Sequence, residues 1–206
     1  MGEKIQGWKQ EIKNHKKLII LSLVFLAIAV VLNSTAGNYA DRKGTVAVSD
    51  LILDNIPTLD LDFFFIYGFA SILIIFFVYP LFFRVRDLHI AISQFSLLVL
   101  IRSFFISLTH LNIPINALIY TAPAWFMALD FKNALFFSGH TAVPFLGFLL
   151  FRKEKIGVFF LILTGIMALT VLFMHIHYSI DVFAAFFITY GSFKIGGWLF
   201  KRMNHY

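Results

Sequence analysis

Runs of apolar residues alternate with short polar segments along almost the whole chain. A run of about 20 apolar residues is long enough to cross the roughly 30 Å hydrocarbon core of a bilayer as an α-helix. The pattern therefore predicts an all-α, polytopic membrane protein with six transmembrane helices. Their expected limits are 18–32, 63–83, 88–111, 136–151, 156–174 and 176–200.

Basic residues gather on one side of these predicted spans. Residues 1–17 carry five lysines against two glutamates, and the segments 84–86 and 152–155 are also basic. The segment 38–62 holds five aspartates, and we expect it to lie outside together with 112–135. Because Lys and Arg favour the cytoplasmic side, both termini are expected to be cytoplasmic. In a bacterium the membrane would be the plasma (inner) membrane.

The chain is expected to form one membrane domain. Residues 1–17 are predicted to be a cytoplasmic basic segment, and 18–206 the six-span domain. A basic segment before an apolar run also resembles a cleaved signal peptide, but the later spans and their charges favour an uncleaved first span. Residues 112–135, rich in aromatic side chains, are expected to form a re-entrant or interfacial cap.

Composition narrows the class of protein. Of the 206 residues, 60% are hydrophobic and 18% aromatic, and the mean hydropathy is +0.85, which is too apolar for a soluble domain of this size. The net charge of +6 is explained by the cytoplasmic segments and needs no nucleic-acid partner. Because the chain contains no cysteine, disulfides, thiolate metal sites and cysteine nucleophiles are excluded.

A histidine and an aspartate at the start of the last predicted span are the first candidates for chemistry. His177 and Asp181 are four residues apart, a spacing that places both on one face of a helix. A histidine oriented by a carboxylate can act as nucleophile or general base at neutral pH. An ionised aspartate in a membrane segment costs about 3 kcal/mol on insertion, which indicates a function. The alternative is a hydrogen-bonded pair that only joins two helices.

The segment Ser138-Gly139-His140 precedes another apolar run. Pro144 would clash with the carbonyl of His140 inside a helix, so we expect the helix to begin near Thr141. The segment would then lie at a helix N-terminus, where free backbone N–H groups and the helix dipole favour an anion. The sequence therefore predicts a phosphate-binding site, with an ordinary helix cap as the alternative.

Three polar positions are predicted to lie at one depth. At 1.5 Å per helical residue, Arg102, His140 and Asp181 lie about 22, 18 and 20 Å from the inner boundaries of their spans. All three fall in the extracytoplasmic half of the bundle. Arginine is the side chain best shaped to bind phosphate, so we expect the active site for an anionic group to lie there.

Segments 137–141 and 177–182 resemble the paired motifs of the sphingomyelin synthases, a branch of the type 2 phosphatidic acid phosphatase superfamily. Two further segments resemble motifs of the same branch: 102–111 in its third span and 50–54 in its first outer loop. The resemblance touches four segments in the same order, and it implies six spans.

The resemblance implies a phosphoenzyme mechanism. The family's counterpart of His177 attacks phosphorus, and that of Asp181 orients and activates it. The counterpart of His140 protonates the leaving alkoxide and then deprotonates the incoming hydroxyl. The residues expected to bind substrate are Arg102, Ser138, Gly139 and Tyr178.

The chain departs from the family pattern at two places. The phosphatase branch has an arginine where this chain has Val171, so Arg102 is the only cation at a motif position. One cation suits a phosphodiester better than a phosphomonoester, which favours a transferase. The synthases carry Cys-Gly-Asp near 132–135, where this chain has no cysteine, and this leaves the headgroup open.

Three functions are therefore considered. The first is a lipid phosphotransferase that moves a phospho-headgroup from a glycerophospholipid to a lipid hydroxyl through a phosphohistidine, with membrane lipids as partners. The second is a lipid phosphatase that hydrolyses phosphatidic acid or a related lipid. The third is a membrane transporter or scaffold without catalysis, which the set of His140, His177 and Asp181 argues against. The acceptor lipid and the oligomeric state stay open.

Two other histidines, His110 and His175, lie near the predicted site but match no motif position, and their roles stay open. A metal site would have only Asp181 and histidines as ligands, and no His-Glu-x-x-His spacing occurs. We therefore expect no metal and no cofactor.

Overall fold

The computed structural model describes residues 2–43, 46–127 and 133–201. Within these ranges the chain is helical, with one isolated β-bridge between Val46 and Leu111 and no strand. The predicted all-α class is thereby confirmed. Residue 132, at the departure from the family pattern, and residues 202–206 of the predicted membrane domain lie outside the described residues.

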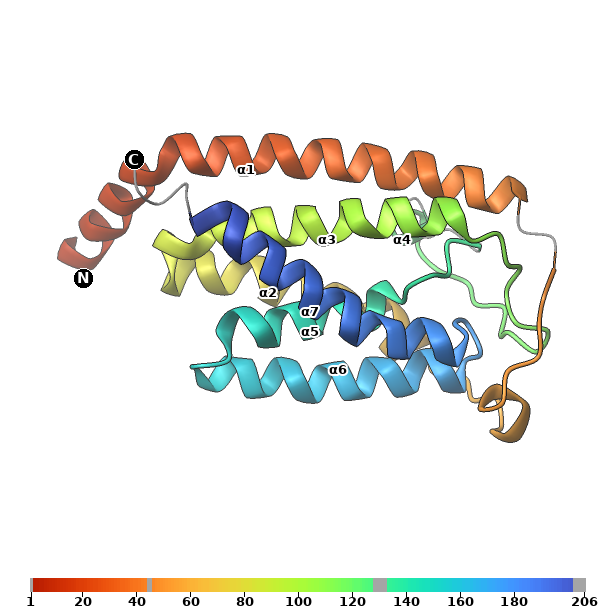
Figure 1. Ribbon diagram of the computed structural model, residues 1–206. Coiled ribbons are helices and arrows are strands. Elements are labelled where there is room, and N and C mark those ends of the chain that lie inside the picture. The colour runs from red at the N-terminus through yellow and green to blue at the C-terminus, as the bar shows by residue number, and fades with distance from the viewer. Residues whose placement is uncertain (1, 44–45, 128–132, 202–206) are drawn as a thin grey trace.

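The long helices lie side by side in one bundle (Figure 1). The start of the first helix and the end of the last lie together at what we call the terminal end, and the long connections 46–63 and 109–127 lie at the opposite, loop end. The elements are α1 (Gly2–Lys43), the 3-10 turn η1 (Leu53–Asn55), the π turn η2 (Phe64–Gly68), α2 (Phe69–Phe83), the 3-10 turn η3 (Val85–Asp87), α3 (Leu88–Leu108), α4 (Ala124–Met127), α5 (Gly139–Phe151), α6 (Lys155–Phe173) and α7 (Ser179–Lys201).

Within the described residues, five helices are long and apolar enough to cross a membrane, as expected of a multi-pass membrane protein. They cover Gln6–Lys43, Phe64–Phe83, Val85–Leu108, Lys155–Phe173 and Ser179–Phe200. The predicted span 136–151 is helical only over the 13 residues of α5, or about 20 Å. It is shorter because Ser138 is extended and caps the helix with its side chain. Five of the six expected spans are thus present as long helices.

Several predicted helix limits were wrong. The first span and the basic segment before it form one continuous helix, α1, which no proline interrupts and which reaches 11 residues beyond the predicted end at Leu32. The third span ends at Leu108, before the predicted Leu111, because Thr109 is extended. The helix α5 starts two residues before the predicted Thr141.

The helix α1 packs chiefly against α3. Its buried residues Ser22, Ala29, Ala36 and Ala40 are small, and the first three recur every seventh position. Small side chains let two membrane helices approach closely, and a seven-residue spacing keeps them on one face. The large apolar residues of α1 are mostly exposed, which is suitable for a surface facing lipid.

Phenylalanine rings form the core between the other helices. The buried ring of Phe76 on α2 lies 5.7, 6.4 and 6.2 Å from the rings of Phe95, Phe151 and Phe160. These rings belong to α3, α5 and α6 and meet at angles typical of aromatic contacts. The core therefore fixes the relative positions of the helices that carry the candidate site at the loop end.

Ion pairs and a tyrosine hydrogen bond join the helix connections at the terminal end. Glu154 accepts hydrogen bonds from the Tyr79 hydroxyl and from Arg84, whose Nη1 lies 2.5 Å from the carboxylate. Arg86 reaches Glu11 on α1 at 2.6 Å. These contacts join α1, the α2–α3 connection and the α5–α6 connection.

The tight α5–α6 connection makes Gly157 a test of the fold. A Cβ at this position would lie 2.4 Å from the carbonyl oxygen of Phe151 and 2.9 Å from Cα of Arg152. Because these are backbone atoms, Gly157→Ala is expected to destabilise the protein by about 3 kcal/mol. Gly165→Ala on the same helix meets nothing within 4 Å and should be neutral or stabilising by up to about 1 kcal/mol. Unfolding in detergent, followed by circular dichroism, measures both, and equal stabilities would contradict the predicted clash.

Candidate active site

The N-termini of α5 and α7 meet at the loop end of the bundle. The backbone N–H of Ser138, which caps α5, donates to the carbonyl of Asp181 in the first turn of α7 at 3.1 Å. Ser138 Oγ accepts from the N–H of Thr141 at 3.4 Å, so the helix-cap role considered for Ser138 is confirmed. The two sequence motifs are therefore joined directly through the backbone.

The prediction that His177 and Asp181 share a helix face was wrong, because α7 begins only at Ser179. The two side chains nevertheless lie together, with His177 Nδ1 3.5 Å from Asp181 Oδ2. This oxygen also accepts the N–H of Tyr178 at 3.0 Å, so the carboxylate folds back over the residues before the helix. Asp181 is 1% exposed and His177 5%. Nδ1 faces the carboxylate, which leaves Nε2 as the nitrogen available for chemistry.

His140 occupies the first turn of α5 and is almost fully buried. Its ring lies between those of Phe65 and Phe69, each with a centroid 4.1 Å away. Its Nε2 has no hydrogen-bond partner among the described residues. Ser138, two residues before His140, bonds to the carbonyl of Asp181, so the structure brings His140 and the His177/Asp181 pair together at the loop end of the bundle.

Arg102 lies against the start of α5. Its Nε donates to the carbonyl of Phe137 at 3.1 Å, its Nη2 to that of Ala134 at 2.5 Å, and its Nη1 to Asn33 Oδ1 at 3.4 Å. A Cβ on Gly139 would lie 3.5 Å from Arg102 Nε, so the glycine backbone and the guanidinium are neighbours. Arg102 therefore holds the segment before α5 in place and brings a positive charge to the helix N-terminus.

Tyr178 is buried, and its hydroxyl is held by the two long connections at the loop end. The hydroxyl donates to the carbonyl of Asn112 at 2.9 Å and accepts from the N–H of Val48 at 3.1 Å. The side chain therefore connects both long connections to the turn between His177 and Asp181. Its predicted contact with substrate stays a prediction.

Sequence reasoning missed two groups that shape the site. One is the aromatic pair Phe65 and Phe69, whose spacing of four residues is a usable signal but is hidden among 27 phenylalanines. The other is the role of Asp50, whose Oδ2 accepts the N–H of Ser179 at 2.7 Å. A carboxylate at a helix N-terminus is favourable, and here it attaches the connection 46–63 to the start of α7.

The two other histidines near the predicted site, His110 and His175, make different contacts from His140 and His177. The ring of His110 meets that of Tyr39 edge-on at 5.2 Å. His175 is buried with a positive φ of 53° and lines a cavity between the long connections at the loop end. Among the described residues, no group of three or more His, Cys, Asp or Glu side chains is placed to hold a metal ion.

The bundle, with its buried His140, His177 and Asp181 and the half-buried Arg102, defines a membrane protein with a polar site at one end of its helices. No protein-family model, no curated protein and no solved structure matches the chain. The functional assignment therefore rests on the site itself and on the motifs.

Proposed function

We propose that the protein is a membrane-embedded lipid phosphotransferase. It moves a phospho-headgroup from a glycerophospholipid to a lipid hydroxyl through a phosphohistidine at His177. The observation that carries this proposal is the buried set of His140, His177 and Asp181, which the hydrogen bond from Ser138 to Asp181 joins in one place. Buried ionisable side chains in a membrane segment are a mark of function.

In the first displacement, Nε2 of His177 attacks phosphorus. The new P–N bond forms as the bond from phosphorus to the glycerol oxygen breaks, and His140 gives its proton to the departing alkoxide. Diacylglycerol leaves. Asp181 at 3.5 Å stabilises the positive charge that develops on the ring, and such contacts commonly shorten when substrate binds. Arg102 and the N–H groups at the start of α5 stabilise the phosphate oxygens.

In the second displacement, the hydroxyl of the acceptor lipid attacks the same phosphorus. His140 accepts the proton of the hydroxyl, and the P–N bond breaks. The products are the new phospholipid and the original His177 ring. Each histidine thus ends the cycle in its starting protonation state, and no further reactant is needed.

A six-span topology with both termini cytoplasmic places this site in the extracytoplasmic half of the membrane. The helix α5 would be the one further span, fourth in chain order, with the residues before Ser138 completing the crossing that its 13 residues begin. The basic segments at the terminal end favour a cytoplasmic location for that end. The loop end, where α5 and α7 begin, would then face the extracytoplasmic leaflet.

The chemistry of the site favours a lipid acceptor over water. The side chains of His177 and Asp181 are nearly fully buried, and a closed apolar surrounding limits hydrolysis of a reactive intermediate. Val171, at the position of the second arginine in the phosphatases, is completely buried. A phosphomonoester with almost two negative charges would be poorly compensated there.

The test measures acceptor dependence. Purified protein is given a headgroup-labelled glycerophospholipid in mixed micelles, with or without ceramide or a diacylglycerol whose acyl chains differ from those of the donor, and products are separated by chromatography. We expect a labelled new phospholipid only when the acceptor is present, with diacylglycerol as the other product. Release of free phosphate from phosphatidic acid, without any acceptor-dependent phospholipid, would instead identify a phosphatase. Arg102→Lys serves as a matched variant, since it keeps the charge and loses the bidentate geometry.

A further inference from the structure

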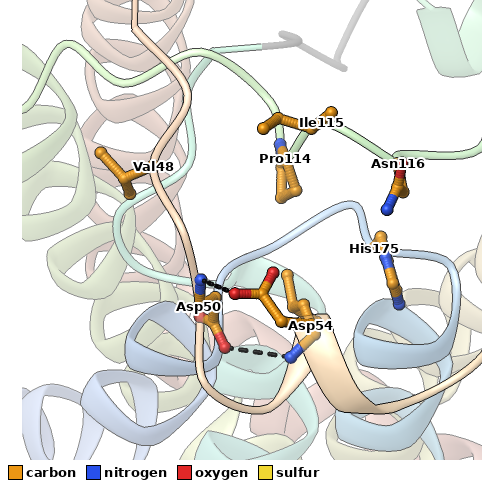
Figure 2. Close-up of a pocket in the computed structure, with 8 residues that line it drawn as sticks. Val48, Asp50, Asp54, Pro114, Ile115, Asn116 and His175 are labelled. Atoms are coloured by element: carbon orange, nitrogen blue, oxygen red, sulfur yellow. Dashed lines mark hydrogen bonds between the residues drawn. The ribbon is translucent and has the colours of Figure 1, made fainter.

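A small cavity lies among the loops at the loop end, beside the residues of the candidate active site. Its volume is about 20 Å³, enough for one small polar group. Figure 2 shows Asp50 and Asp54 on one side, with Pro114, Asn116 and His175 around the rest of it. The cavity is thus lined by side chains from the first outer loop, the second outer loop and the turn before α7.

Two carboxylates give this cavity a negative character. Within the described ranges, neither Asp50 nor Asp54 forms an ion pair with a lysine or arginine. Burial raises the pKa of the Asp50 carboxyl, but hydrogen bonds from the backbone of Ser179, Leu53 and Ile52 outweigh burial and lower it. Asp50 is therefore ionised at neutral pH. Asp54 accepts the N–H of Asp50 at 3.2 Å.

His175 provides an independent sign that the cavity takes a ligand. It is 2% exposed, and its Nε2 has no hydrogen-bond partner among the described residues. Its backbone has a φ of 53°, which is uncommon for a residue other than glycine. A buried polar atom without a partner costs about 1–3 kcal/mol. Both features are expected where a side chain is kept in place for binding.

The cavity adjoins the proposed phosphoryl site through direct contacts. Asp50 holds the N–H of Ser179, two residues before Asp181. His175 lies two residues before His177. A group bound between Asp50, Asp54 and His175 would therefore be close to a phosphate held at His177.

We propose that this cavity binds the primary ammonium group of the donor lipid, so that the preferred donor is a zwitterionic phospholipid with an ethanolamine-type headgroup. This inference rests on the proposed function. The ammonium group donates to the carboxylates of Asp50 and Asp54, while the adjoining phosphodiester lies against the start of α5. Three N–H donors on a compact charge match a small cavity with several oxygen acceptors.

Other cations fit the cavity less well. Quaternary ammonium groups bind in aromatic cages, and His175 contributes the only aromatic ring among the residues that line this cavity. Calcium takes six to eight oxygen ligands, whereas the described residues hold no cluster of three or more metal-binding side chains. The primary ammonium is therefore the occupant that the cavity favours.

The direct test measures headgroup binding without catalysis. Calorimetry compares glycerophosphoethanolamine with glycerophosphoglycerol, which lacks the positive charge, on purified His177→Ala protein. We expect the ethanolamine compound to bind about tenfold more tightly, and Asp54→Asn to remove this difference because the amide keeps the hydrogen bond to Asp50 and loses the charge. Ethanolamine alone should bind more weakly, since it lacks the phosphate.

Asp60→Asn is the matched control. Asp60 lies in the same loop, is exposed like Asp54, and also accepts one backbone N–H, that of Asp62 at 3.2 Å, but it does not line the cavity. This variant should keep the tenfold preference. Equal affinities for the two compounds in the parent protein, or no binding of glycerophosphoethanolamine, would overturn the proposal, as would an equal loss in both variants.

The two proposals can fail separately. Selective binding of the ethanolamine compound by a protein that transfers no headgroup would reject the transferase and retain the ammonium site. Acceptor-dependent transfer from phosphatidylglycerol and phosphatidylethanolamine with equal kcat/KM, unchanged in Asp54→Asn, would retain the transferase and reject the ammonium site.

Discussion

Replacing His177 with alanine is expected to lower the rate of headgroup transfer by roughly 10⁴-fold or more, because removal of a nucleophile eliminates the covalent route. The side chain is 5% exposed and forms its ion-pair contact only with Asp181 among the described residues. The bundle should therefore still form. Turnover of a labelled phospholipid, together with the thermal unfolding temperature, separates loss of chemistry from loss of folding.

His110→Ala is the control for this prediction. His110 contacts the ring of Tyr39 at the loop end and has no part in the proposed mechanism, so its variant should keep most of the activity. A His177→Ala protein that is folded and still transfers headgroups at a comparable rate would refute the phosphohistidine.

The second large loss of transfer rate is expected for His140→Ala, and unlike that of His177→Ala it should depend on the leaving group of the substrate. Without a general acid, transfer from an ordinary phospholipid should fall by about 10²–10⁴-fold. A phosphodiester with a nitrophenyl leaving group needs no proton, so it should still phosphorylate His177. The intermediate should then accumulate, because no base deprotonates the acceptor. The accumulated phosphohistidine is measured as a burst of nitrophenolate and as an acid-labile label on the protein.

The double variant His140→Ala/His177→Ala checks where the label forms, and it should give neither burst nor label. If His140→Ala reacts as slowly with the nitrophenyl substrate as with phospholipid, His140 is not the general acid. Its position between Phe65 and Phe69 would then serve packing alone.

The hydrophobic pattern was sufficient for most of the bundle, because membrane helices need long apolar runs whatever their tertiary contacts. It failed at α5, where the run 136–151 contains three residues that form no helix. Ser138 is extended there because its Oγ caps the helix and its N–H bonds to Asp181. The second of these contacts comes from a residue more than 40 positions away, which periodicity cannot reveal.

The candidate residues could be selected from the sequence, but their geometry could not. A spacing of four residues suggested one helix face for His177 and Asp181, whereas Asp181 reaches the ring from the first turn of a helix that excludes His177. The cause is that a side-chain hydrogen bond competes with the helix for a backbone N–H. Asp181 Oδ2 accepts the N–H of Tyr178 and so holds the turn before α7. Side-chain to backbone bonds of this kind commonly end helices.

The small buried residues of α1, where it packs against α3, have a consequence for the order in which the helices assemble. During synthesis α1 enters the bilayer before α3 exists, and it must stay there as a single helix until α2 and α3 have followed. Its exposed large apolar residues make this single helix stable in lipid, while Ser22, Ala29 and Ala36 leave a face that a second helix can approach closely. Docking of α3 would then bring Arg102 to Asn33 on α1, so Arg102 reaches its final position only when the first and third helices have met.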